Sequence, residues 1–247
     1  MSPPLPQEIF DLIVDHLHDD PTTLEACCLV SLSWIPRARR HLFTHIYIWY
    51  PESIGSWMKV FPDPSNSPAR YARTMCVDVS AIPFMTSSDA RPWVRAFHLV
   101  KILDFECRRE DHGESSEIVD LLCSFPLLED LRLGFSVSDS KIGDSWDTPS
   151  NSPGLSGALT LYDVKACPLI PRLLRLPGGI HFTRIAVVCS TEVTRSISDL
   201  VLRCSHTLEY LGIRYYPSRA FPPSFVIDLY LISNRHRSDH TRKAHPA

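Results

Sequence analysis

Glycine is scarce in the sequence, and the motifs that depend on glycine are missing with it. The 247 residues include 9 glycines, and these form neither a phosphate-binding loop nor a nucleophile elbow. The 8 cysteines include no Cys-x-x-Cys pair, so the spacing predicts no zinc site. The acidic and histidine side chains at residues 15–20 are expected to be the solvated end of a helix. We therefore predict a non-enzymatic protein with no cofactor and no bound metal.

Long apolar runs and a large net charge are missing as well. No apolar run approaches the ~20 residues that cross a bilayer, and the N-terminal residues lack the pattern of a signal peptide. The formal net charge of -3 argues against nucleic acid as the main partner. We expect a cytoplasmic or nuclear protein with no membrane and no nucleic-acid partner, in which the cysteines are free and mostly buried.

Proline is abundant. The chain has 21 prolines, and 44% of its residues are apolar, which is typical of a folded protein rather than of a disordered chain or a coiled coil. So many prolines predict short elements that end abruptly. The length suits a small module joined to a larger one.

The N-terminal segment shows the spacing of three short helices. An apolar stripe at helical spacing marks the first helix: Ile9, Leu12, Ile13 and Leu17. Asp20 can cap a second helix that Pro21 begins, and this helix carries Leu24. A third helix follows Trp34. A module of this size cannot enclose all of its apolar side chains, so some of them should face a partner.

The same segment resembles an F-box, and in particular the large fungal F-box families. The match covers residues 5–48 and consists of the opening Leu5-Pro6-Gln7-Glu8-Ile9, the central Leu24 and the closing Val30-Ser31-Leu32-Ser33-Trp34. One departure is Ser31, where many members have cysteine. The resemblance implies a three-helix module that docks on the Skp-type adaptor of a cullin-RING ubiquitin ligase. It implies that these residues lie on or just behind the docking face: Leu5, Pro6, Ile9, Ile13, Leu17, Leu24, Val30, Ser31 and Trp34. The alternative is that they form only the core of a helical cap.

A repeat runs through the rest of the chain. The pattern apolar-x-apolar recurs at steps of 26 to 28 residues, near 77–79, 103–105, 131–133, 159–161, 185–187 and 211–213. An earlier copy is Ile46/Ile48. Helix-like stretches lie between the copies, at 92–100, 115–125, 168–176 and 195–204. The pattern resembles leucine-rich repeats without their asparagine ladder and predicts an α/β solenoid with a parallel sheet. An irregular α/β domain with parallel strands is the alternative.

Because strand side chains alternate, the polar residues between the apolar ones should line the exposed, concave face of the sheet. The predicted target-binding residues on this face are Asp78, Asp104, Glu106, Asp130, Arg132, Tyr162, Arg184, Tyr210 and Arg214. This face is expected to be acidic early and basic late in the chain. Ordinary solvated strand faces are the alternative.

These patterns divide the chain into an F-box module at 1–48, a leucine-rich-repeat-like solenoid at 49–233 and a basic, disordered tail at 234–247. A mobile excursion is expected at 136–157, and no further strand is expected near residue 238, which suggests a truncated repeat array. We predict a substrate-recognition adaptor of a Skp-cullin-F-box (SCF) ubiquitin ligase, with an unknown protein target. Two alternatives are a repeat scaffold whose F-box acts outside ubiquitination and an enzyme of unknown type.

Overall fold

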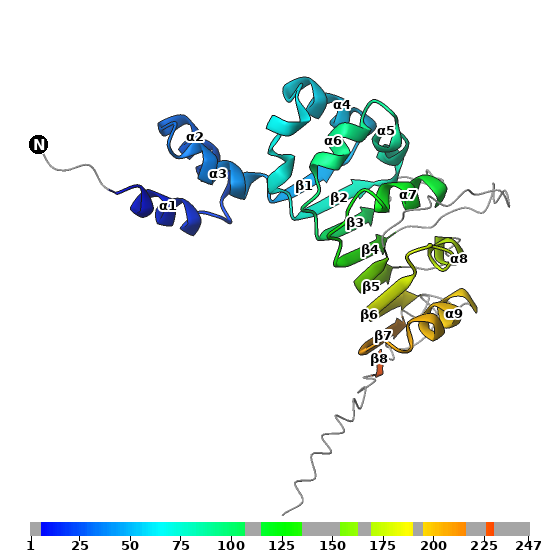
Figure 1. Cartoon of the computed structure of the whole chain (residues 1–247). Coiled ribbons are helices and arrows are strands. Elements are labelled where there is room, and N and C mark those ends of the chain that lie inside the picture. Colours follow the sequence, from blue (N-terminus) through cyan, green and yellow to red (C-terminus); the bar gives the residue numbers. More distant parts are fainter. Residues whose placement is uncertain are drawn as a thin grey trace, which may run out of the picture.

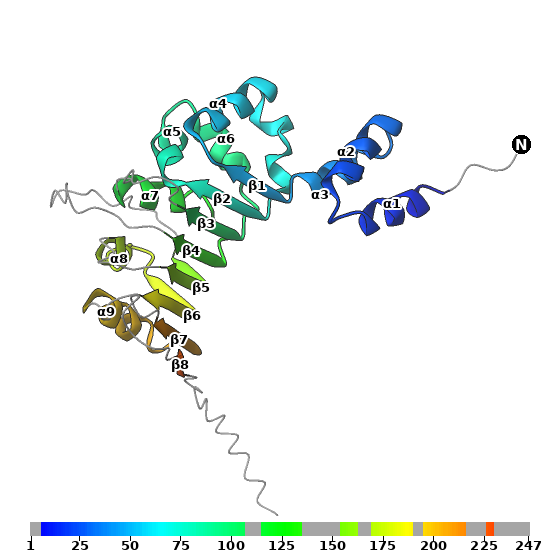
Figure 2. The ribbon, with the colours of Figure 1, turned by 180° about the vertical axis from the view of Figure 1, so that it is seen from behind.

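The computed structural model of the chain describes residues 6–106, 115–134, 154–162, 169–189, 195–215 and 226–229. Within these ranges, three N-terminal helices precede one sheet of eight strands. The remaining helices lie along one face of this sheet (Figure 1). The opposite face carries no helix of the described residues, and Figure 2 shows the arrangement from behind.

The N-terminal helices are α1 (Gln7–His16), α2 (Pro21–Val30) and α3 (Ile35–Leu42). Asp20 caps α2, because its carboxylate accepts a hydrogen bond from the backbone N–H of Thr23 at 3.1 Å. Pro21 stands in the first turn, where the missing N–H removes no helical hydrogen bond. The three helices that the apolar spacing predicts are present.

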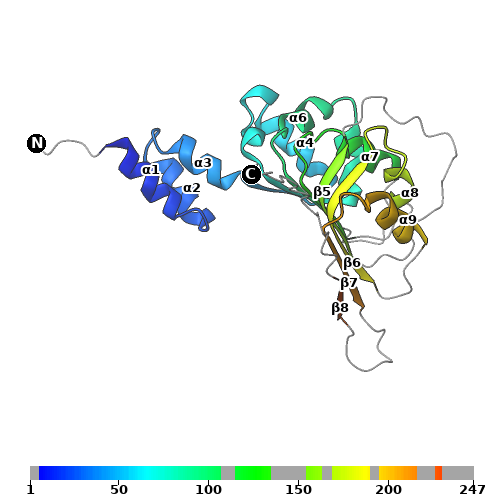
Figure 3. The same ribbon diagram turned by 60° about the horizontal axis from the view of Figure 1, so that its bottom comes forward.

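These helices have a core of their own, which consists of Val14, Leu24, Cys27 and Ala38. The core is small because each helix has only two or three turns. Helix α3 contacts the short 3-10 helix η2 (Pro68–Tyr71), next to the sheet. Figure 3 shows α1 to α3 projecting beyond the end of the sheet that β1 forms.

The sheet contains eight strands in sequence order: β1 (His45–Ile48), β2 (Thr74–Asp78), β3 (Ile102–Glu106), β4 (Asp130–Gly134), β5 (Leu155–Tyr162), β6 (Ile180–Cys189), β7 (Tyr210–Tyr215) and β8 (Val226–Leu229). The first seven are parallel, and β8 pairs with β7 in the antiparallel direction. An α/β fold with a parallel sheet, as predicted, is therefore confirmed.

The connections supply the remaining helices. They are α4 (Pro51–Val60), α5 (Ile82–Thr86), α6 (Arg91–Ala96), α7 (Ser115–Leu122), α8 (Leu169–Leu173) and α9 (Arg195–Cys204), together with the 3-10 helices η1 (Pro64–Asn66), η2 and η3 (Val79–Ala81). Proline stands in the first turn of α4, α5 and α6, which accounts for part of the high proline content. The sequence did not predict α4 and α5. No described helix is both long enough and apolar enough to cross a bilayer.

Two rows of apolar side chains join the sheet to its helices. In β2 to β6 the first row is Met75, Leu103, Leu131, Leu159 and Ile185, and the second is Val77, Phe105, Leu133, Leu161 and Val187. All ten side chains are buried. Burying a side chain of this size stabilises a fold by about 1.5–3 kcal/mol, so these rows fix the face that the helices cover.

The register of the second strand corrects the repeat pattern. We predicted that Val77 and Val79 align with Leu103 and Phe105. Instead Met75 and Val77 pair with these residues, and Val79 begins η3. The strand spacing is therefore 28 residues here as well. A shift by two residues keeps every side chain on the same face, so the apolar alternation does not distinguish the two registers.

The ends of the sheet also differ from the prediction. Ile46 and Ile48 do form an earlier copy, because β1 pairs in register with β2. At the other end, β8 is an additional strand that comes well before residue 238. Residues 155–157 belong to β5 rather than to an excursion. The predicted tail at 234–247 and residues 136–153 of the predicted excursion lie outside the described residues.

The cysteines agree with the expectation of free thiols where the structure describes them. Cys27, Cys76 and Cys204 are buried, Cys28 and Cys123 are half-buried, and none of these five forms a disulfide. Burial raises the pKa of the Cys204 thiol, which disfavours the reactive thiolate. The other three cysteines are outside the residues whose side chains are described.

Candidate protein-binding surfaces

The first candidate surface, called the helical surface below, consists of exposed apolar side chains on the N-terminal helices. Its members are Ile9, Leu12 and Ile13 on α1, and Leu29, Val30 and Leu32 at the end of α2 and in the following turn. Leu29 and Leu32 are 89% and 85% exposed. So many large apolar side chains in contact with water on a module this small indicate a surface that a partner covers.

The predicted docking residues differ in their exposure to solvent. Pro6, Ile9, Ile13 and Val30 are exposed, and Leu17, Ser31 and Trp34 are half-buried. Leu24 is only 1% exposed, so it supports the surface from behind and cannot itself touch a partner. Leu5 lies outside the described residues.

Three members of the helical surface were not among the predicted residues: Leu12, Leu29 and Leu32. Leu12 stands three residues after Ile9, which is a spacing that places both on one side of a helix. This spacing could have identified it. No comparable signal in the sequence distinguishes Leu29 from its buried neighbour Cys27.

Asp15 of α1 interacts with two side chains of α3. Arg37 donates from Nε to Asp15 Oδ1 at 2.6 Å and from Nη2 to Asp15 Oδ2. His41 Nε2 lies 2.8 Å from the same Oδ1. The hydrogen bonds from Arg37 and His41 hold the pKa of the Asp15 carboxyl well below its usual range. We had expected Asp15 to be part of a solvated helix end. Instead it joins α1 to α3 through hydrogen bonds.

The second candidate surface is the uncovered face of the sheet. Strand alternation brings the polar residues of β3 to β7 to this face, as predicted. Acidic residues come first, with Asp104, Glu106 and Asp130, and the arginines follow, with Arg132, Arg184 and Arg214. The face therefore changes from acidic to basic along the sheet.

The structure corrects the prediction that Asp78 is a target-binding residue. It stands at the end of β2 and is 4% exposed, because its carboxylate accepts a hydrogen bond from the Ser80 backbone N–H at 3.0 Å and another from the Ser80 hydroxyl. These bonds cap η3. Asp78 is a structural cap and is not available to a target.

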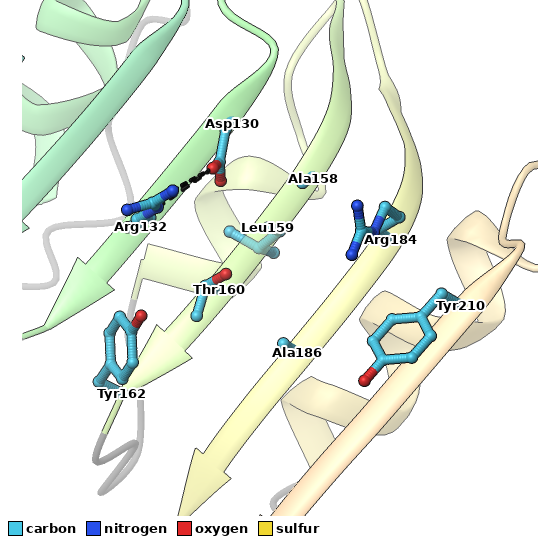
Figure 4. A pocket seen from close by; sticks show the side chains of 9 residues that line it. All are labelled: Asp130, Arg132, Ala158, Leu159, Thr160, Tyr162, Arg184, Ala186 and Tyr210. Carbon is cyan, nitrogen blue, oxygen red and sulfur yellow. Dashed lines mark hydrogen bonds and ion pairs between the residues drawn. The ribbon is translucent and has the colours of Figure 1, made fainter. Parts of the chain in front are cut away.

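A hollow of about 400 Å³ lies on this face over β4 to β7, and it is called the sheet hollow below. Small side chains form its floor, namely Ala158 and Thr160 of β5 and Ala186 of β6. Larger side chains surround them: Asp130, Arg132, Tyr162, Arg184 and Tyr210. Figure 4 shows Asp130 and Arg132 on one side of the floor and Arg184 and Tyr210 on the other. The sheet hollow thus brings five of the nine predicted target-binding residues together.

The charged groups around the sheet hollow differ in what they contact. Arg132 donates to Asp130 Oδ2 from Nε at 3.1 Å and from Nη2 at 2.8 Å, and this bonding raises the pKa of the Arg132 guanidinium. Asp130 Oδ1 is buried and has no hydrogen-bond partner among the described residues. The Arg184 guanidinium lies 5.6 Å from the centre of the Tyr210 ring, within cation–π distance.

Next to the sheet hollow, Asp104 of β3 lies in an acidic environment. Burial raises the pKa of its carboxyl, and the negative charges of Glu106 and Asp130 raise it further. In the described ranges, no group of three or more histidine, cysteine, aspartate or glutamate side chains is arranged to hold a metal ion.

Comparison of the chain with protein-family models, with curated proteins and with solved structures returned no match.

Proposed function

We propose that this protein is the substrate-recognition adaptor of an SCF-type ubiquitin ligase. In this proposal the helical surface binds the Skp-type adaptor, the uncovered face of the sheet binds a target protein, and catalysis belongs to partner subunits. The observation that carries the proposal is the helical surface itself. Its exposed apolar side chains lie in a segment that resembles an F-box in the order of its residues.

The energetics of the N-terminal helices support a docking role. Their core has only four fully buried residues, while six large apolar side chains remain exposed. A partner that covered these side chains would gain the transfer free energy of each of them. Such clusters of apolar anchors dominate the affinity of protein interfaces.

The regular sheet supports a role in target recognition. Strands at steps of 28 and 26 residues pair in register, and the same backbone bonds recur between them. The carbonyls of Thr44, Arg73 and Lys101 each accept two N–H groups from the start of the next strand. Backbone bonds of this kind join the units without the asparagine ladder. We interpret the units as a degenerate leucine-rich-repeat solenoid, whose long open face suits a protein partner.

Together, the two surfaces would act by proximity. A chain that holds a ligase scaffold at one end and a target at the other raises the local concentration of the target near the transferred ubiquitin. No catalytic group of this chain is needed for that effect.

The test is co-purification of the full-length chain with the Skp-type adaptor and cullin. The double variant Ile9→Ala/Ile13→Ala removes two anchors that are already exposed, so adaptor recovery should fall at least about tenfold with an unchanged melting temperature. Leu202→Ala is the matched control, because Leu202 is 70% exposed on α9, away from the helical surface. Failure of the wild-type chain to bind the adaptor, or full binding by the double variant, contradicts the proposal. Adaptor binding without cullin indicates a repeat scaffold that acts outside ubiquitination.

A further inference from the structure

We infer that the sheet hollow binds an oxyanion on a target segment, either a carboxylate or a phosphate, and that Arg184 is the residue that holds it. This inference rests on the proposed role of the sheet face in target recognition, and it adds the chemistry of the recognised side chain.

The shape of the sheet hollow suits a single inserted side chain. Its volume of about 400 Å³ is at the lower end of the range for ligand pockets. Ala158, Thr160 and Ala186 are small and leave space above the middle strands, whereas Arg132 and Tyr210 lie on either side of them (Figure 4). A side chain that enters from a protein partner would therefore be surrounded by protein on several sides.

Arg184 is the charged group of the sheet hollow that is available to a ligand. It is exposed, and no carboxylate of the described residues forms an ion pair with it. The Tyr210 ring lies beside its guanidinium at 5.6 Å and limits the orientations of the side chain. A guanidinium that is oriented before binding loses less entropy when it bonds a planar carboxylate or a phosphate.

The acidic residue of the sheet hollow does not offset this positive charge. Asp130 is bonded to Arg132 through Oδ2, and its second oxygen is buried, so a ligand cannot reach it directly. The opposite charges of Asp130 and Arg132 therefore compensate each other. The positive charge of Arg184 is not compensated by an ion pair with a described carboxylate. The hydroxyls of Thr160 and Tyr162 also line the hollow and can donate to a bound oxygen.

The experiment measures which peptides the full-length chain retains. The probes are four pools of blocked nonapeptides with uncharged, randomised flanks and a central glutamate, phosphoserine, glutamine or lysine. We expect the glutamate pool, the phosphoserine pool or both to be retained about tenfold more than the glutamine and lysine pools. Preference for phosphoserine identifies the oxyanion as a phosphate, and equal or greater retention of glutamate identifies a carboxylate.

Three variants locate the effect. Arg184→Gln should lower retention of the anionic pools to the level of the glutamine pool, with an unchanged melting temperature because the side chain is exposed. Ala186→Leu should also lower it, because the larger side chain fills the floor of the sheet hollow without changing its charge. Arg203→Gln is the matched control on α9, where the arginine is exposed on the helical side of the sheet, and it should behave like the wild type.

Several results would overturn the inference: equal retention of all four pools, preference for lysine, or an anion preference that survives Arg184→Gln or Ala186→Leu. The same preparations are tested for co-purification with the Skp-type adaptor. Adaptor binding without anion selection refutes this inference alone. Anion selection without adaptor binding refutes the proposed ligase function and leaves the sheet hollow as an oxyanion site of a different protein-binding chain.

Discussion

Asp15 is the residue on which the arrangement of the N-terminal helices depends most directly. It belongs to α1, and both of its hydrogen-bonding partners, Arg37 and His41, belong to α3. The Asp15 and Arg37 side chains are each about one-third exposed, so water screens part of their interaction. Such a tie orients two helices more than it stabilises them. The pH dependence of the packing of α1 on α3 follows from the low pKa of the Asp15 carboxyl.

Asp15→Asn should destabilise the packing of α1 on α3 by about 1 kcal/mol at neutral pH, after allowance for the partial exposure of the pair. A carboxyl whose pKa is lowered in the folded state contributes stability that is fully present above its unfolded pKa of about 3.9. This contribution is lost as the pH falls through the lower, folded-state pKa. The difference between variant and wild type should therefore shrink below about pH 4. Urea titrations followed by NMR of the α1 and α3 methyl groups measure it, and Glu25→Gln, an exposed residue of α2, should show no such difference.

Gly157 occupies a backbone position that excludes other residues. Its φ is +88°, and a Cβ at this position would lie 2.0 Å from the Glu129 carbonyl oxygen. Gly157→Ala should therefore cost more than about 2 kcal/mol of unfolding free energy. Gly55→Ala is the counterpart inside α4, where a Cβ meets nothing within 4 Å, and it should stabilise by about 0.5–1 kcal/mol. Thermal and urea unfolding of both variants measure the difference. Equal effects would show that the left-handed conformation of Gly157 is not required.

At the scale of the elements, the alternation of side chains determines which substitutions a strand tolerates. Ile102 and Leu103 are neighbours on β3, but Leu103 is fully buried under the helices and Ile102 is half-buried on the open face. The two residues are both large and apolar, so their different positions on the strand should dominate the effect of replacing them.

Leu103→Thr should destabilise the protein by about 2–4 kcal/mol, because it leaves a cavity and buries a hydroxyl. Ile102→Thr should cost less than about 1 kcal/mol, since threonine suits a half-exposed strand position. Urea unfolding of the two variants under one set of conditions makes the comparison. A larger loss for Ile102→Thr would mean that the faces of β3 are assigned the wrong way round.

Strands β1 to β7 could be predicted from the sequence because each contains two apolar residues separated by one other residue. The error at Val79 arose where apolar alternation continues past the end of β2, from Met75 through Val77 to Val79. Two other elements gave weaker signals. The helix α5 spans only Ile82–Thr86, and β8 runs antiparallel, so its spacing from β7 falls outside the repeat.

The candidate sites were predictable only where they depend on local order. Alternation along each strand placed Arg132 and Arg184 on the open face, but it could not show that Arg132 is bonded to Asp130 while Arg184 remains available. The tie between Asp15 and Arg37 spans 22 residues, and nothing in the local sequence around either residue indicates it. Pairings of this kind depend on how elements pack, which local propensity and alternation do not reveal.

At the scale of the whole molecule, the residues that the structure describes form two hydrophobic cores of unequal size. The larger core runs under the sheet from Ile46 to Leu211, whereas the smaller consists of four buried residues among the N-terminal helices. A core of four residues supplies little stability by itself. The N-terminal helices should therefore open more readily than the sheet, and a partner that binds them should lower the population of the open form by mass action.

Leu24→Ala tests whether the two cores are independent. Leu24 is the largest of the four residues in the small core and is 1% exposed, so its loss should cost about 2–5 kcal/mol. That amount is enough to open α1 to α3, because the helices retain only three other fully buried residues. Hydrogen–deuterium exchange should then show loss of protection in α1 to α3 and unchanged protection in β2 to β7. Leu200→Ala in α9, where the leucine is fully buried in the large core, should produce the opposite pattern. Loss of protection in both regions from either variant would mean that the cores unfold as one unit, and docking at the helical surface would then stabilise the sheet as well.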